Sequence, residues 1–309
     1  MIKIEKSGKI LEKTKQYWEE DMNLREENFY LMKKYNIKAQ KKYGQNFLIN
    51  EEVLDKIIKS ADIKKGDLVI EIGPGLGNLT KRLCEKAYKV IAIEIDENMV
   101  DILSKEYSDL TNLEVLNMDI MQCDLNNIIQ KYPNKKIKVV ANLPYYITTP
   151  IIMKLLEDGL NIDLIEVMVQ KEVALRLCAV PNNRDFGAIT LAINFYTNAE
   201  YMFTVPAGDF LPSPNVDSAI VRMEVIKNKI EVEDKDLLFK IIKASFSMKR
   251  KTLLNSLGSA KIFGIDKNTL ETILTELDIS LNSRAENLSV YDYIKITEKY
   301  LKLQKKKAV

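Results

Sequence analysis

The 309-residue sequence contains no histidine, and this absence excludes a large share of enzyme chemistry. Ser-His and Cys-His nucleophilic triads, HExxH zinc sites and histidine general bases all need that side chain. Its three cysteines, Cys84, Cys123 and Cys178, are scattered without CxxC spacing, which argues against a disulfide framework and a cysteine zinc site. Any chemistry must therefore come from a cofactor, carboxylates, amides, tyrosines or lysines, and we expect no bound metal.

Long apolar runs are also lacking. No stretch approaches the roughly 18 apolar residues that a membrane-spanning helix needs. The N-terminal segment MIKIEKSGKILEKTKQ has neither the apolar core nor the small-residue cleavage site of a secretory signal. We therefore expect a cytoplasmic protein that does not associate with membranes.

The net charge is only +2, but it is distributed unevenly. Residues 1–48 carry a net charge of +4, residues 49–227 carry −7 and residues 228–309 carry +5. Basic segments around an acidic centre suggest that the flanks hold a polyanion while a small ligand binds centrally. Solvated helix faces produce the same pattern, so charge alone leaves both interpretations open.

Apolar segments alternate with amphipathic ones from residue 51 to residue 226. Such strands, separated by helices, are typical of a parallel sheet covered on both faces. The sequence therefore predicts an α/β fold with a doubly wound, Rossmann-like sheet. We expect strands at 67–72, 89–95, 113–118, 137–142, 165–170 and 216–226, and helices at 51–61, 79–86, 99–106 and from about 149.

The pattern changes after residue 226, where only short amphipathic helices follow from Asp234 onward. We therefore expect a small all-α C-terminal domain. The predicted division is a polar helical N-terminal extension at 1–40, an α/β domain at 41–227 and a helical domain at 228–309. For the extension, a solvated helix pair on the surface is favoured over an arm that binds nucleic acid.

A glycine-rich loop, Gly73-Pro74-Gly75-Leu76-Gly77, ends the first predicted strand and opens a helix. Glycines let backbone N–H groups approach a ligand, and a helix N-terminus favours an anionic group. A nicotinamide site would need glycine at position 78, where the chain has Asn78. The spacing suits instead the amino-acid end of S-adenosylmethionine, although a glycine turn that only packs a helix remains the alternative.

Two acids follow the next strands. Glu94 ends the second predicted strand, from which a carboxylate can accept hydrogen bonds from ribose hydroxyls. Asp119 follows the third strand and could accept from the adenine amino group of the cofactor. Both acids are expected at the same edge of the sheet as the glycine loop.

The tetrapeptide Asn142-Leu143-Pro144-Tyr145 ends the fourth predicted strand. The Asn142 side-chain oxygen and the Pro144 carbonyl can accept hydrogen bonds from an amino group, and Tyr145 offers a face on which a base can stack. The adenine amino nitrogen is a poor nucleophile because its lone pair is delocalised into the ring. Two acceptors would hold it in line with a sulfonium methyl group and favour the developing positive charge. No strong base is required.

With these motifs the sequence resembles the KsgA (RsmA) family of small-subunit ribosomal RNA adenine dimethyltransferases over about residues 41–300. The motifs occur in the family's order along the chain. They are GQNFL (44–48), EIGPGLG (71–77), NLPY (142–145), QKEV (170–173), FLPSPNVDSA (210–219), KRKT (249–252) and RAENLS (284–289).

The resemblance implies a class I methyltransferase that uses S-adenosylmethionine, releases S-adenosylhomocysteine and acts as a monomer. It implies N6,N6-dimethylation of two adjacent adenosines in a hairpin loop near the 3′ end of 16S rRNA, late in assembly of the small ribosomal subunit. The cofactor would contact Gln45, Asn46, Leu48, Gly73, Gly75, Glu94, Asp119 and Asn142. The target adenine would contact Asn142, Leu143, Pro144, Tyr145 and, on its other face, Phe210. The rRNA would contact Lys249, Arg250 and Lys251.

Two rivals of different kinds remain at this stage. An Erm-type enzyme, which methylates large-subunit rRNA, shares the fold and a related tetrapeptide, although Leu143 and the KRKT and RAENLS segments match the KsgA family better. A ribosome-assembly factor that binds rRNA without chemistry would need neither the glycine loop nor the tetrapeptide. A nicotinamide oxidoreductase is disfavoured by Asn78 and by the missing histidine.

Overall fold

A computed structural model describes residues 22–227, 231–248, 250–260 and 266–307 of the chain. Its contacts divide the chain into two compact units. The first unit comprises Met1–Lys171 and Met202–Arg222, and the second comprises Glu172–Tyr201 and Met223–Val309. Among the described residues, no helix is long and apolar enough to cross a membrane.

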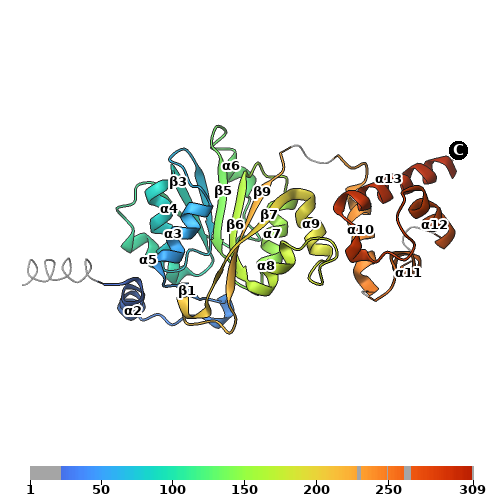
Figure 1. Cartoon of the computed structure of the whole chain (residues 1–309). Helices are drawn as coiled ribbons and strands as arrows, with labels where there is room; N and C mark the ends of the chain where they lie inside the picture. Colours follow the sequence, from blue (N-terminus) through green and yellow to red (C-terminus); the bar gives the residue numbers. More distant parts are fainter. Residues whose placement is uncertain (1–21, 228–230, 249, 261–265, 308–309) are drawn as a thin grey trace, which may run out of the picture. The chain divides into compact units, whose positions relative to one another are not determined.

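A seven-stranded sheet with the order β4-β3-β2-β5-β6-β9-β7 runs through the α/β part of the chain (Figure 1). Numbered within the sheet in chain order, this is 3-2-1-4-5-7-6. The five strands from β4 to β6 are parallel to one another. The strands are β2 (Leu68–Ile72), β3 (Lys89–Glu94), β4 (Leu113–Asn117), β5 (Ile137–Asn142), β6 (Leu164–Gln170), β7 (Thr197–Val205) and β9 (Ser218–Val225).

The predicted Rossmann-like fold is confirmed, because all six predicted strands are present with ends that differ by two residues or fewer. All five residues of β2 are buried, as expected of a strand covered on both faces. The order of the strands reverses between β2 and β5, and in such sheets ligands bind at the carboxyl edge of this switch point.

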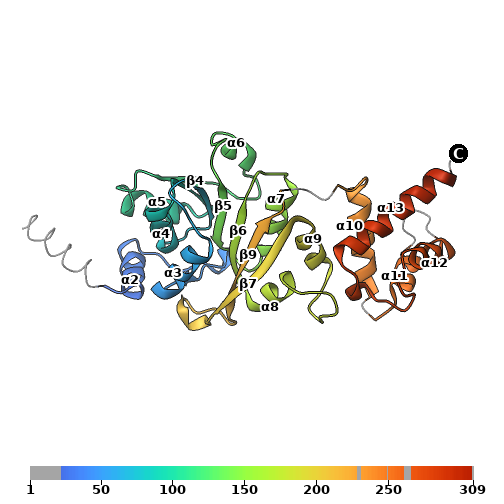
Figure 2. The same ribbon diagram turned by 45° about the horizontal axis from the view of Figure 1, so that its top comes forward.

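Helices lie on both sides of this sheet. Figures 1 and 2 show α3 and α4 on one side of the central strands and α7 on the other. Several of these helices begin at a capping residue. The Asn50 side chain, for example, accepts a hydrogen bond from the Val53 backbone N–H and caps the start of α3. The α-helices among the described residues of the first unit are α2 (Leu24–Lys34), α3 (Glu51–Ser60), α4 (Asn78–Lys86), α5 (Glu97–Glu106), α6 (Leu125–Ile129) and α7 (Thr148–Glu157).

A two-stranded antiparallel ribbon connects two segments that are far apart in the sequence. Strand β1 (Phe47–Leu48) pairs with β8 (Phe210–Leu211), so that Leu48 lies opposite Phe210. The ribbon brings the GQNFL and FLPSP motifs together. Strands of two residues carry no periodic signal, and the sequence did not predict them.

The second unit has its own buried core of leucine, isoleucine and aromatic side chains. Phe195 of α9 meets Phe239 of α10 edge-on, with ring centroids 5.4 Å apart. Residues 172–201 therefore pack with the C-terminal helices, whereas the predicted domain boundary lies near residue 228. The helices here are α8 (Lys171–Leu177), α9 (Ala188–Tyr196), α10 (Lys235–Ser245), α11 (Leu253–Ser259), α12 (Lys267–Glu276) and α13 (Val290–Lys307).

Candidate active site

One pocket lies at the carboxyl edge of β2, β3 and β5, where the sequence predicts it. Both the glycine loop and the tetrapeptide line this pocket, and a Cβ built on Gly73 would lie 3.9 Å from the Asn142 carbonyl oxygen. The two motifs on which the sequence-based hypothesis depends are therefore neighbours. The pocket is lined by Gln45, Asn46, Leu48, Gly73, Gly75, Glu94, Asp119, Asn142, Leu143, Pro144 and Tyr145 among others.

The glycine loop is held in a conformation that other residues rarely adopt. Gly75 has φ +58°, and a Cβ built on it would lie 3.0 Å from the Phe47 ring. Gly77 has φ +89° and precedes α4, whose first turn receives no side-chain capping bond and contains no acid. Backbone N–H groups at this helix start thus remain available for an anionic group such as a carboxylate.

Glu94 is tied to the loop by its own carboxylate. One oxygen accepts from the Gly75 backbone N–H at 3.2 Å, and the other accepts from the Asp96 backbone N–H at 2.9 Å. Burial raises the pKa of Glu94, while the backbone N–H donors act in the opposite direction by stabilising the charged form. A carboxylate has about four acceptor sites, so the group keeps capacity for a further donor, such as a ribose hydroxyl.

Glu71, Asp119 and Glu166 also line the pocket, and of these Glu71 and Asp119 lie next to the predicted cofactor motifs. Glu71 is buried, and burial raises its pKa to about 8, which favours the protonated form of its carboxyl group. Asp119 is half-buried and accepts from the Met121 backbone N–H at 2.9 Å. Asp119 is therefore the more accessible of these two carboxyl groups for a ligand.

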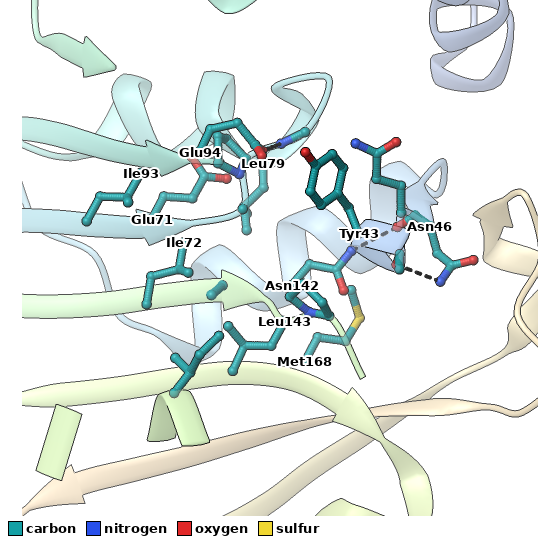
Figure 3. A pocket seen from close by; sticks show the side chains of 18 of the residues that line it. Tyr43, Asn46, Glu71, Ile72, Leu79, Ile93, Glu94, Asn142, Leu143 and Met168 are labelled. Carbon is teal, nitrogen blue, oxygen red and sulfur yellow. Dashed lines mark hydrogen bonds between the residues drawn. The ribbon is translucent and has the colours of Figure 1, made fainter. Parts of the chain in front are cut away.

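Asn142 is oriented by a neighbour from the GQNFL motif. Its side-chain nitrogen donates to the Asn46 carbonyl oxygen at 3.0 Å, as Figure 3 shows. This bond fixes which end of the amide is the donor, so that Oδ1 is left to accept a hydrogen bond. The orientation agrees with the acceptor role that the sequence predicts for this side chain.

The carbonyl of Pro144 is already engaged. It accepts from the Thr148 hydroxyl at 3.0 Å and from the Ile147 backbone N–H at 3.2 Å. A carbonyl oxygen has two lone pairs, so these two hydrogen bonds occupy both of them. The preceding carbonyl, that of Leu143, accepts no such hydrogen bond within the described parts of the chain. The expected acceptor role of Pro144 therefore fits this geometry less well than the same role for Leu143.

Tyr145 is anchored through its hydroxyl, which lies 2.6 Å from the Ser218 hydroxyl. Burial raises the pKa of Tyr145, so the phenol stays neutral. The next residue, Tyr146, is 62% exposed and also lines the pocket. Neither Tyr146 nor Ser218 is predicted as a site residue from the sequence, although Ser218 lies within the FLPSPNVDSA motif.

Some predicted residues do not lie at the pocket. Phe210 does not line it: its side chain is only 3% exposed and belongs to a core cluster that includes Leu48. Arg250 and Lys251 are exposed residues of the second unit, just before α11. Lys249 lies outside the described residues.

Asn78, which occupies the position where a nicotinamide site would need glycine, makes a structural contact. Its side-chain nitrogen donates to the Leu48 carbonyl oxygen at 2.8 Å and so links the start of α4 to β1. No cluster of three or more cysteine, aspartate or glutamate side chains in the described ranges is placed to hold a metal ion.

This chain is similar to known proteins over most of its length. A family model described as "Ribosomal RNA adenine dimethylase" matches residues 36–302. The chain belongs to this family. The resemblance inferred from the sequence motifs is thereby confirmed, and the family is one of enzymes that use S-adenosylmethionine.

Two proteins similar to this chain carry the name "Ribosomal RNA small subunit methyltransferase A". The one from Alkaliphilus metalliredigens (strain QYMF) is 42% identical over 270 residues, which cover 87% of this chain and 94% of that protein. The one from Clostridioides difficile (strain 630) is 45% identical over 265 residues, which cover 85% and 91%.

The chain is also similar to solved structures. A dimethyladenosine transferase from Plasmodium falciparum aligns with it with a TM-score of 0.71 and 30% sequence identity. The match covers 83% of this chain and 98% of that one. The 23S rRNA methyltransferase ErmE aligns with a TM-score of 0.64 at 23% identity over 82% of this chain and 99% of its own. That likeness shows a common fold alone.

The pocket residues fit S-adenosylmethionine. The backbone of Gly73 borders the pocket without a side chain to fill it, and the uncapped start of α4 can receive the carboxylate of the amino-acid end. Glu94, at the end of β3, is placed as an acceptor for hydroxyl groups. The pocket thus offers donors for the amino-acid end of this cofactor and an acceptor for its ribose hydroxyls.

Proposed function

We propose that this chain transfers methyl groups from S-adenosylmethionine to the N6 atoms of two adjacent adenosines in a hairpin loop near the 3′ end of 16S rRNA. The product would be N6,N6-dimethyladenosine, formed late in assembly of the small ribosomal subunit in the cytoplasm. The proposal depends most on the orientation of the Asn142 side chain. Asn142 lines the same pocket as the glycine loop, and its bond to the Asn46 carbonyl leaves its amide oxygen able to accept a hydrogen bond. Relatives at 42% and 45% identity, named for the small-subunit rRNA, support the choice of substrate.

The proposed chemistry depends on positioning. S-adenosylmethionine supplies a methyl group bound to a sulfonium centre. Asn142 Oδ1 and the Leu143 carbonyl would accept the two hydrogens of the adenine amino group, which directs the nitrogen lone pair toward that methyl group and stabilises the positive charge on nitrogen. We assign the second acceptor to Leu143 because both lone pairs of the Pro144 carbonyl are used by Ile147 and Thr148.

The target base would stack on Tyr145. Its ring is restrained by the bond to Ser218, so little conformational entropy is lost when a base binds. An adenosine in a hairpin loop is already partly unstacked, and this lowers the cost of bringing it into the pocket. For Phe210, the expected stacking on the other face would require its buried ring to become accessible from the pocket.

The basic residues of the second unit would bind the rRNA backbone. Arg250 and Lys251 are exposed beside the start of α11, and Lys249 would extend the same run. Phosphate contacts of this kind give affinity without sequence specificity. We expect the chain to act as a monomer, with the small ribosomal subunit as its partner.

Tritiated S-adenosylmethionine offered with four substrates tests the proposal. These are unmethylated small subunits, large subunits, and the naked rRNA of each. We expect label in small subunits, recovered as N6,N6-dimethyladenosine from two neighbouring positions. Label confined to large-subunit RNA would favour an Erm-type activity instead. Binding of small subunits without any label would indicate a non-catalytic assembly factor.

A further inference from the structure

Helix α2 (Leu24–Lys34) is not an isolated surface helix. Leu24, Asn28 and Leu31 form a buried stripe along one side, whereas Phe29 and Tyr30 on other sides are 50% and 38% exposed. The helix start is fixed by a capping box between Asn23 and Glu26. The family model begins at residue 36, after this helix ends, so family membership assigns α2 no role.

The buried side of α2 meets the parts of the pocket that hold the cofactor. Leu31 belongs to a small buried cluster with Phe47, Leu76, Met99 and Ile102. Leu76 lies inside the glycine loop, and Phe47 lies between Asn46 and Leu48. Four partly buried residues that pack against the cluster come from the same N-terminal segment: Met32, Tyr35, Ile37 and Ala39.

Polar contacts join the segment to the same region. The Gln40 backbone N–H donates to the Gln45 side-chain oxygen at 2.8 Å, and the Gln45 side-chain nitrogen donates to Asp96 at 2.8 Å. Asp96 is buried and donates its own N–H to Glu94. At the other end, Tyr35 donates to Glu106 of α5. The segment therefore reaches the glycine loop through the cluster of Leu31 and Leu76, and residues 44–48 through the bond from Gln40 to Gln45.

We propose that α2 and the strap that follows it, residues 35–43, position the glycine loop and residues 44–48 for S-adenosylmethionine. Leu31 acts as a positioning residue: it touches no substrate, but it packs with Leu76 and Phe47 in the cluster that holds both loops. Preorganised loops bind a ligand more tightly because less entropy is lost on binding. The inference rests on the cofactor of the proposed function and not on the identity of the RNA.

The test compares single substitutions in the full chain by calorimetric titration with S-adenosylmethionine. Leu31→Ala is expected to weaken binding by about three-fold to ten-fold. Phe29→Ala removes a large side chain from the exposed side of the same helix and is expected to bind as the wild type does. Tyr35→Phe is a milder change that removes the hydroxyl group and its bond to Glu106, and it should weaken binding in the same direction. It keeps the inference testable if the Leu31 variant does not fold.

A further variant separates positioning from general loss of stability. Leu164→Ala truncates a buried leucine at the amino end of β6, the sheet edge opposite the pocket. It should lower the melting temperature without weakening cofactor binding. In steady-state methylation, Leu31→Ala should raise KM for S-adenosylmethionine with kcat largely kept. Equal cofactor affinity in the Leu31 and Leu164 variants would overturn the inference. Because the titration contains no RNA, failure of the proposed rRNA substrate would not affect its outcome.

Discussion

Gly77 offers a quantitative test of how tightly the glycine loop is packed. A Cβ built on Gly77 would lie 2.4 Å from a ring carbon of Tyr107 and 2.8 Å from a methyl carbon of Leu103. Neither neighbour can move easily, because both are buried and the Tyr107 hydroxyl donates to the Leu76 carbonyl at 3.0 Å. Alanine at this position therefore has to displace the start of α4 or break the Tyr107 contact.

Two effects add in Gly77→Ala. The φ angle of +89° costs a residue with a side chain about 1 kcal/mol, and the overlap with packed neighbours costs about 1–3 kcal/mol more. We therefore expect the free energy of unfolding to fall by about 3 kcal/mol in total. Affinity for S-adenosylmethionine should fall as well, because any displacement moves the loop that would hold it.

Gly159→Ala is the matched control. Gly159 has φ +69°, but a Cβ built on it meets nothing within 4 Å, so only the backbone cost of about 1 kcal/mol applies. Urea unfolding of the wild type and the two variants gives both values, and titration with the cofactor gives the affinities. Equal destabilisation by the two substitutions, with cofactor affinity unchanged in both, would refute the packing argument.

Three further predictions follow from single contacts. Burial raises the pKa of Glu166 from 4.5 to about 8. The folded state therefore keeps a proton that the unfolded state loses, and the free energy of unfolding falls as the pH rises through this range. In urea unfolding, Glu166→Gln should reduce this dependence on pH, whereas Glu52→Gln at an exposed position should not. Tyr145→Phe should keep most of the methylation rate, whereas Tyr145→Ala should lose about ten-fold to a hundred-fold by loss of stacking; equal rates would argue against stacking. Replacing Arg250 and Lys251 with alanine should weaken binding to small subunits and flatten its dependence on salt, and an unchanged salt slope would remove them from the RNA contact.

The sequence predicted most of the sheet because its central strands are buried on both faces. Runs such as 68–72 and 137–142 are mostly apolar and almost fully buried, which gives a signal within each segment alone. Strand β7 (Thr197–Val205) was missed because its residues alternate between exposed and partly buried along most of its length. A search for apolar runs does not detect such a strand.

The location of the site residues was predictable where it follows from the order of the strands along the chain. Parallel strands end at one edge, so the residues after β2, β3 and β5 had to meet. Which backbone carbonyls are free to accept a hydrogen bond was not predictable from the sequence. It depends on the turn at residues 144–148, in which Ile147 and Thr148 donate to the Pro144 carbonyl. The packing of α2 against the glycine loop depends likewise on contacts between distant segments.

The rate of a single turnover by Asn142→Ala tests the central claim most directly. The measurement uses unmethylated small subunits and S-adenosylmethionine at saturating concentration, so that a change in cofactor affinity does not enter the rate. Loss of a positioned acceptor for the amino group should lower the rate by about a hundred-fold or more, while the variant still binds small subunits. A rate equal to that of the wild type would contradict the proposal that this amide orients the adenine nitrogen for methyl transfer.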